Sequence, residues 1–243
     1  MKAGKVRKKV LALLLAGTAI LGLTGGGTMQ VEAAGQENAY VDTSSYEQLY
    51  KLYEDYFKLG IACQAMDHWN DPTAEIGNQE KEELINRMFN SMTFGNELKP
   101  AYNFDASSEN LFKVDFAAEE MLEWAKENNM KVRGHVLVWH SQVDPSIFAI
   151  DYQAYADGKL TKSDTAKLDE ECLVDREELL ARLKRYIYGV LEYTYKNGYA
   201  DVIYAWDVVN EAADENQYDG LRRSYWYQII GPDYLYYAFL YAR

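Results

Sequence analysis

The sequence is poor in the residues that build metal centres and disulfide frameworks. It contains two cysteines, Cys63 and Cys172, and three histidines among 243 residues. Two cysteines give no disulfide framework, and both two unpaired thiols and a single optional bridge are compatible with them. No cysteines, histidines or carboxylates recur at the spacing of metal ligands. We therefore expect neither a disulfide scaffold nor a metal site.

Several enzyme motifs are also missing. The sequence has no nucleophile elbow, no phosphate-binding loop and no dinucleotide fingerprint, so we expect no cofactor. It has four prolines, and no linker or low-complexity tract follows the glycine-rich stretch near residue 25. With 48% hydrophobic residues the chain can bury a sizeable core, and these features together predict one domain.

Positive charge is scarce. Lysine and arginine total 25 against 38 acidic residues, which gives a formal net charge of −13. So acidic a chain repels nucleic acid and anionic membranes, and we expect neither as a partner. The charge suits a protein that acts on a neutral polymer or a small molecule.

The longest apolar run lies near the N-terminus and is too short to span a membrane. Residues 10–23 form this run of 14, behind a basic head, whereas a spanning helix needs about 18 or more apolar residues. Val31 and Ala33 suit a signal-peptidase cut after Ala33. We expect a signal peptide at residues 1–33, a short linker at 34–45, and a secreted protein. Removing residues 1–33 takes away five positive charges and one negative charge and changes the net charge to −17.

Past residue 46, strand-like and helix-like segments alternate. Strands are predicted at residues 57–64, 91–97, 131–140 and 202–209, the first as a short buried strand and the last as the end of an apolar run bound for the interior. Amphipathic helices are predicted at residues 80–90, from Asp115 to Asn128, from Asp175 to Asn197, and from Gly231 onward. Each carries an apolar stripe that we expect to be buried: Leu84, Ile85, Met88 and Phe89 in the first, Ala118, Met121, Leu122 and Ala125 in the second, Leu179, Leu183, Ile187, Val190, Leu191 and Thr194 in the third, and Leu235, Ala238, Phe239 and Ala242 in the fourth. Four strand-helix units predict a parallel sheet covered on both faces, either doubly wound or a barrel. A (β/α)₈ barrel takes eight strand-helix units and roughly 250 residues. The four units predicted here therefore correspond to about half of such a barrel.

Polar side chains gather where three of the predicted strands end. They are Asn96 and Lys99 after the second strand, His135, Trp139 and Gln142 on and after the third, and Asn210 and Glu211 after the fourth. In parallel α/β folds the carboxyl ends of the strands form the functional site. Each residue alone has an ordinary structural role available, such as a helix-start carboxylate for Glu211 or a surface charge for Lys99. Their coincidence at one rim favours a site.

The chemistry of this set is coherent. A carboxylic acid can protonate the oxygen of a glycosidic bond, amides and ammonium groups can hydrogen-bond sugar hydroxyls, and indole rings can cover pyranose faces. The segments SMTFGNELKP, VRGHVLVWHSQ, WDVVNEA and LRRSYWYQIIGPDYLYYAFLYAR follow one another in the sequence. In these segments the chain, from about residue 46 to 243, resembles the glycoside hydrolase family 10 endo-β-1,4-xylanases.

The resemblance implies a (β/α)₈ barrel and a retaining, two-carboxylate mechanism acting on xylan or xylo-oligosaccharides. Glu211 corresponds to the acid/base, and Asn210 to a contact with the sugar 2-hydroxyl beside the scissile bond. Asn96 and Lys99 correspond to ligands of the sugar on the non-reducing side. The same subsites would be lined by His135, Trp139 and Gln142.

The chain departs from the family pattern in three ways. Gly95 stands where the family commonly has a glutamate, so the sugar contact is either missing or supplied by Glu97. A tryptophan usual soon after the HSQ stretch is absent from residues 143–148. The nucleophilic glutamate of the family lies on strand seven, which this chain does not reach. We therefore expect the 243-residue chain alone to be nearly inactive and its partner to be the missing half of its own barrel. Two alternatives remain: a self-associating carbohydrate-binding half-barrel and a related retaining β-glucanase.

Overall fold

The computed structural model describes residues 45–65, 73–151 and 170–243. The described strands and helices all lie in the unit Tyr46–Arg243. The predicted signal peptide and nearly all of the predicted linker lie outside the described residues. Within the described residues, no helix is both long and apolar enough to cross a membrane.

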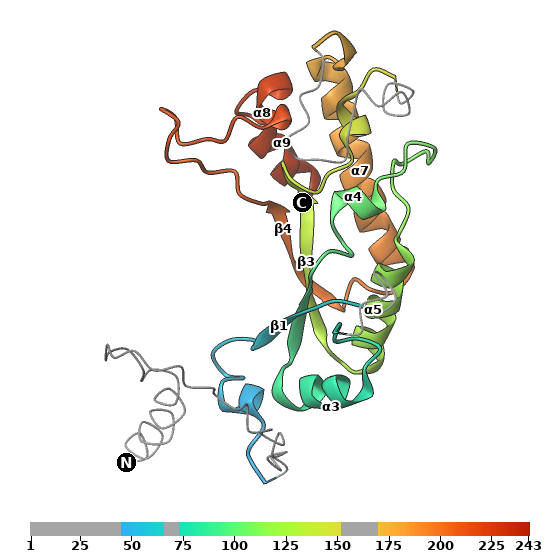
Figure 1. Cartoon of the computed structure of the whole chain (residues 1–243), viewed down its shortest axis with the longest axis vertical. Helices are drawn as coiled ribbons and strands as arrows, with labels where there is room; N and C mark the ends of the chain where they lie inside the picture. The colour runs from blue at the N-terminus through green and yellow to red at the C-terminus, as the bar shows by residue number, and fades with distance from the viewer. Residues whose placement is uncertain (1–44, 66–72, 152–169) are drawn as a thin grey trace, which may run out of the picture. The chain divides into compact units, whose positions relative to one another are not determined.

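A parallel sheet of four strands lies at the centre of the unit (Figure 1). The strands are β1 (Gly60–Cys63), β2 (Ser91–Phe94), β3 (Lys131–Val138) and β4 (Ile203–Val209). They pair in sequence order, so β1 and β4 are the edge strands of the described sheet. All four predicted strands and their parallel pairing are confirmed, although β1 begins three residues later than predicted. The prediction that this first strand is buried is wrong for most of its length, because only Cys63 of β1 is buried at this edge of the described sheet.

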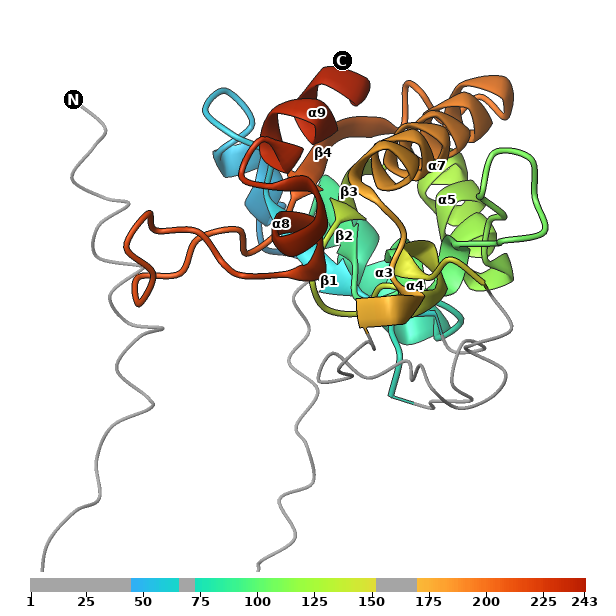
Figure 2. The same ribbon diagram turned by 90° about the horizontal axis from the view of Figure 1, so that it is seen from above.

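Each strand is followed along the chain by one or more helices. They are α3 (Gln79–Met88) after β1, α4 (Pro100–Asn103) and α5 (Phe116–Glu127) after β2, η2 (Pro145–Phe148), η3 (Glu170–Cys172) and α7 (Arg176–Lys196) after β3, and α8 (Tyr225–Ile230) and α9 (Tyr234–Tyr241) after β4. A short 3₁₀ helix, η1 (Leu49–Leu52), precedes β1. Seen from above, α5 and α7 lie on the same side of the sheet (Figure 2).

The two best-predicted helices form for the reasons the sequence indicates. The side chain of Asp115 accepts a hydrogen bond from the main-chain N–H of Ala117 (3.0 Å) and caps α5. Asp175 accepts from the N–H of Glu178 (2.9 Å) and caps α7. The apolar stripe of α5 is buried as expected, at Ala118, Met121, Leu122 and Ala125, and so is most of the stripe of α7, at Leu179, Leu183, Ile187 and Val190.

Two residues predicted to be buried are exposed instead. Leu84 of α3 is 52% exposed and Phe239 of α9 is 57% exposed. Only Ile85 of α3 is buried, and α9 contacts α7, α8 and β4 through the side that carries Tyr234 and Ala238. Periodicity identifies an apolar position on a helix, but burial also requires a neighbouring element on that side.

Trp206 of β4 joins the two parts of the core. It packs against the cluster between α7, α8, α9 and the sheet, and also against the cluster between α3, α5 and the sheet. Its ring lies directly across Gly134 of β3, where an added Cβ would come within 2.3 Å of the indole. Glycine at position 134 is therefore required by this close approach.

A buried carboxylate ties the loop after β2 to the end of β1. Glu97 is fully buried, and its two oxygens accept hydrogen bonds from the main-chain N–H groups of Ala65 and Asn96, both at 2.9 Å. Asn103 of α4 fixes the same loop, because its side-chain amide donates to the carbonyl of Glu97 (2.6 Å). These bonds hold the loop that carries Asn96 and Lys99.

We expect Glu97→Gln to lower the free energy of unfolding by about 1–3 kcal/mol, because the amide NH₂ would face a main-chain N–H and leave both groups unsatisfied. Glu75→Gln is the matched control: the Glu75 carboxylate also accepts from a main-chain N–H, that of Gln64 (3.1 Å), but is partly exposed. Urea unfolding of both variants measures the difference. An equal loss of unfolding free energy in the two variants would show that the burial of Glu97 does not determine the cost of its replacement.

We expect Cys63, which is buried at the end of β1, to resist alkylation at pH 9 in the folded protein and to react in urea. Burial, helped by the nearby Glu75 and Glu97, raises the pKa of the Cys63 thiol from 9.0 to about 12. Because the folded state keeps a proton that the unfolded state loses, this contribution to stability is full below pH 9. It falls as the pH rises towards about 12, by at most about 1.4 kcal/mol per pH unit. The same pH dependence in Cys63→Ala would contradict this assignment.

Candidate functional site

Three of the predicted site residues form a hydrogen-bonded triangle at the carboxyl ends of β2 and β3. The ammonium group of Lys99 donates to Asn96 Oδ1 (2.9 Å) and to Gln142 Oε1 (2.6 Å). Gln142 Nε2 in turn donates to Asn96 Oδ1 (3.0 Å). Lys99 is only 7% exposed, so a charge that the sequence leaves as a possible surface group is held inside the rim.

Trp139 connects this triangle to the end of β4. The Lys99 ammonium lies 5.1 Å from the centre of the Trp139 ring. The indole N–H of Trp139 donates to Glu211 Oε2 (3.2 Å), and His140 Nε2 lies 3.8 Å from the same oxygen. The structure therefore brings the predicted residues of three strand ends into one continuous cluster.

His135 lies on the strand below this rim. Its Nδ1 is 2.8 Å from Asp207 Oδ2 on β4, and its ring centre is 6.1 Å from that of Trp139. Arg133, two residues earlier on β3, donates to the other oxygen of Asp207. Arg133 and Asp207 are not among the site residues predicted from the sequence. Period-two spacing on β3 and a facing acid on β4 would have indicated them, because His135 and Asp207 are directly paired in the sheet.

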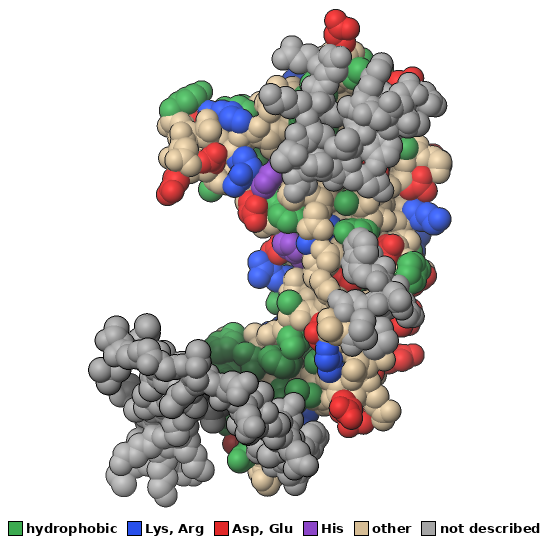
Figure 3. Space-filling view, viewed as in Figure 1, with side chains coloured by type: hydrophobic (Ala, Val, Ile, Leu, Met, Phe, Trp, Pro, Cys, Tyr) green, Lys and Arg blue, Asp and Glu red, His purple; other side chains and the backbone are tan. Residues whose placement is uncertain are grey.

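Asn210 and Glu211 end β4 differently from what the sequence suggests. The main-chain N–H of Asn210 donates to the carbonyl of Val138 (2.9 Å), which extends the pairing with β3. The side chain of Glu211 is 51% exposed, although the strand before it was predicted to enter the interior. On the strands below it, the side chains of Arg133 and Asp207 are also partly exposed, at 55% and 20%. On the face shown in Figure 3, histidine side chains lie among acidic and basic ones on the side away from α5 and α7.

Glu97 does not take the place of the missing glutamate at position 95. Its carboxylate is buried and already bound to two main-chain N–H groups, so that expectation is wrong. The space beside Gly95 is filled by Gln64, whose Cγ would lie 2.7 Å from an added Cβ. A larger residue at position 95 would require Gln64 to move.

The cluster can supply proton transfer and sugar binding but has no metal-binding character. The described residues contain no group of three or more histidine, cysteine or acidic side chains able to hold a metal ion. The exposed carboxylate of Glu211 can give or accept a proton, while the Lys99 triangle offers donors and acceptors to hydroxyl groups. The indole of Trp139 adds an apolar face between them.

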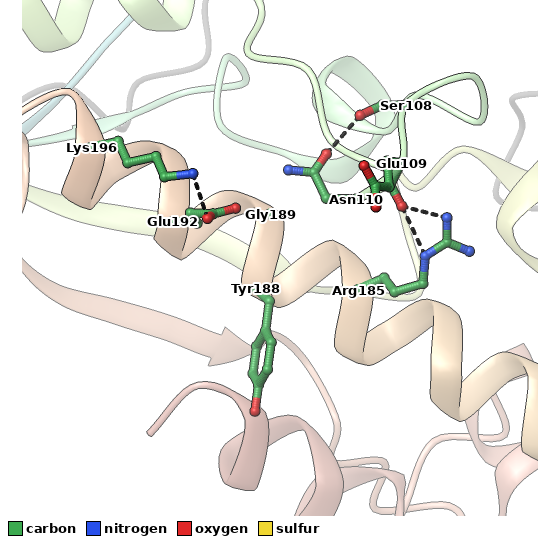
Figure 4. A pocket seen from close by; sticks show the side chains of 8 residues that line it. All are labelled: Ser108, Glu109, Asn110, Arg185, Tyr188, Gly189, Glu192 and Lys196. Carbon is green, nitrogen blue, oxygen red and sulfur yellow. Dashed lines mark hydrogen bonds and ion pairs between the residues drawn. The ribbon is translucent and has the colours of Figure 1, made fainter.

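A larger groove lies elsewhere, between α7 and the loop before α5 (Figure 4). It has a volume of about 970 Å³ and is lined by side chains of both charges. Arg185 donates to the carbonyl of Glu109, and Lys196 pairs with Glu192, so these charged groups are already engaged. None of the site residues predicted from the sequence lines this groove.

Comparison with known proteins agrees with the geometry of the rim. The family model for glycosyl hydrolase family 10 matches residues 48–243. An endo-1,4-β-xylanase A of Caldicellulosiruptor sp. is 40% identical over 194 residues, which cover 80% of this chain and 24% of that protein. An endo-1,4-β-xylanase A of Thermotoga maritima is 38% identical over 196 residues, which cover 80% of this chain and 16% of that protein.

A solved structure of similar fold is an intracellular xylanase of Thermoanaerobacterium saccharolyticum. It is 34% identical, with a TM-score of 0.63, over 82% of this chain and 53% of that one. The chain thus spans about half of this structure and a smaller share of the two relatives above. It belongs to glycosyl hydrolase family 10, and its four parallel strands are part of that family's (β/α)₈ barrel.

Proposed function

We propose that this chain supplies the acid/base half of the active site of a retaining endo-1,4-β-xylanase, with Glu211 as the proton donor. The observation that carries the proposal is the contact between the Glu211 carboxylate and the indole N–H of Trp139 at the rim of a family 10 barrel. Glu211 first protonates the leaving oxygen of the glycosidic bond. It then removes a proton from the incoming water.

The remaining rim residues bind the sugar. Lys99, Asn96 and Gln142 present hydrogen-bonding groups already held within 3.0 Å of one another, so little side-chain entropy remains to be lost on binding. Trp139 covers a pyranose face, and His135 and Asn210 contact hydroxyls next to the scissile bond. A mutant of the T. saccharolyticum xylanase, 33% identical to this chain, has been solved in complex with xylotetraose.

The nucleophile comes from the remaining strands of the barrel. Retaining glycosidases place their two carboxyl groups about 5–5.5 Å apart, one on each side of the bond. Among the described carboxylates at the rim and on the strands below it, we assign neither Glu97 nor Asp207 to the second role, because Glu97 is buried and Asp207 is bound to Arg133 and His135. The chain without those strands is therefore inactive, and the completed enzyme, meaning this chain continued through the second half of its barrel, is active.

A second candidate is activity on β-glucan. One relative, 36% identical over 195 residues, is an exoglucanase of Acetivibrio thermocellus. The two candidates share Glu211 and differ in the sugar. A higher kcat/KM of the completed enzyme on cello-oligosaccharides than on xylo-oligosaccharides of equal length would favour glucan.

We further propose that the protein is exported and cut after Ala33, on the basis of its basic head and short apolar run. N-terminal sequencing of protein from the culture medium should begin at Ala34. Recovery of the uncut chain inside the cells alone would refute export.

In the completed enzyme, we expect Glu211→Gln to lower kcat/KM on xylohexaose by about 10²–10⁴-fold, the usual contribution of a general acid. On dinitrophenyl β-xylobioside the loss should be far smaller, because this leaving group departs without a proton. Glu215→Gln, an exposed carboxylate four residues away, is the control and should change neither value. The chain ending at residue 243 provides the inactive blank. Equal losses on the two substrates would rule out the acid role of Glu211.

A further inference from the structure

Glu211 holds an unusual main-chain conformation. Its φ is +50°, in the left-handed region that residues with a Cβ atom rarely occupy. Gln142 of the same rim has a φ of +44°. Such a conformation persists only where the surrounding structure enforces it. The contacts that fix the main chain of Glu211 therefore also fix where its carboxylate points.

The main chain around Glu211 is held on both sides. On the N-terminal side, the N–H of Asn210 donates to the carbonyl of Val138 on β3. On the C-terminal side, Arg222 Nε donates to the carbonyl of Glu211 (2.9 Å), and the N–H of Arg222 donates to the carbonyl of Ala212 (2.8 Å). Arg222 thus binds two successive carbonyl groups with one side chain and its own main chain.

Arg222 is placed there by the segment of residues 211–224, which we call the arm. The arm leaves the sheet at Glu211, runs away from α5 and α7, and returns before α8 (Figures 1 and 2). Its two limbs pair through an antiparallel bridge between Ala213 and Leu221 and a bond from Asp214 N–H to the carbonyl of Gly220 (2.8 Å). This pairing brings Arg222 back beside Glu211.

The carboxylate itself is held from the other side. Trp139 donates to it, and the carbonyl of Trp139 accepts a hydrogen bond from the indole of Trp226 on α8 (3.0 Å). Arg222 lines the same recess as Glu211, Trp139 and Trp226. Within the described residues, Arg222 forms no ion pair, and the Nε of its guanidinium donates to the main chain of Glu211.

We propose that Arg222 is the positioning residue of the acid/base: it fixes the left-handed conformation of Glu211 and so aims its carboxylate at the leaving oxygen. The inference rests on the proposed role of Glu211. Arg222 acts through the main chain and does not touch the substrate. Without its side chain, Glu211 relaxes towards commoner main-chain angles and the acid no longer reaches its proton acceptor in the correct geometry.

The next residue provides a matched control. Arg223 also belongs to the arm, but its guanidinium binds Asp219 (2.9 and 3.0 Å) and lies 4.1 Å from the ring centre of Tyr227. It therefore stabilises the arm without contacting Glu211. Replacing Arg222 or Arg223 removes the same charge from adjacent positions and separates the aiming of Glu211 from the general stability of the arm.

The test measures kcat/KM of the completed enzyme on xylohexaose, which needs protonation of the leaving group, and on dinitrophenyl β-xylobioside, which does not. We expect Arg222→Ala to lower kcat/KM about tenfold or more on xylohexaose and less than about threefold on the aryl substrate. The loss on xylohexaose is smaller than the full contribution of a general acid, because Glu211 itself is still present. Arg223→Ala should affect both substrates equally and slightly. Glu211→Gln is measured in parallel.

Each outcome decides a different point. A substrate-dependent loss in Glu211→Gln but not in Arg222→Ala overturns the positioning role and leaves the proposed function intact. No substrate dependence in Glu211→Gln overturns the proposed function itself. If Arg222→Ala does not fold, Arg222→Lys decides: it keeps one donor and should show a smaller loss with the same substrate dependence. An equal loss on both substrates in Arg222→Lys would refute the inference.

Discussion

The parallel pairing of four strands in sequence order is the constraint on which the site depends. It places the carboxyl ends of β2, β3 and β4 at one rim, so short loops bring together side chains that are distant in the sequence. Lys99 meets Gln142 there, and Trp139 meets Glu211, although 43 and 72 positions separate the two pairs. None of these contacts is local, and none would survive a change in strand order.

The parts of the fold that the sequence predicts well are those fixed by local chemistry and a full set of neighbours. Asp115 and Asp175 cap helices because short carboxylates satisfy the first main-chain N–H groups wherever they precede an apolar stripe. The stripes of α5 and α7 are buried because the sheet lies beside them. Leu84 and Phe239 have the same periodicity but lie where nothing described covers them.

The candidate site could be identified as a set of residues but not as a network. Position at or after a strand end, together with side-chain chemistry, indicated the seven predicted site residues from Asn96 to Glu211, but not His140, which lies 3.8 Å from the Glu211 carboxylate. The hydrogen bonds between them depend on strand register and loop geometry, which pattern analysis does not supply. For the same reason the role of Glu97 was not predictable: only the structure shows that both its oxygens are bound to main-chain N–H groups. The guanidinium of Arg222 beside Glu211 was missed likewise.

The order of strand pairing also has a consequence for synthesis. Each strand of the described sheet after β1 pairs with the strand made just before it, so β2, β3 and β4 each find a partner that the ribosome has already released. β3 can join β1 and β2 as it emerges, and the newest strand then forms one open edge of the sheet. Glu211, at the end of β4, then arrives at a rim where Lys99 and Gln142 have already met.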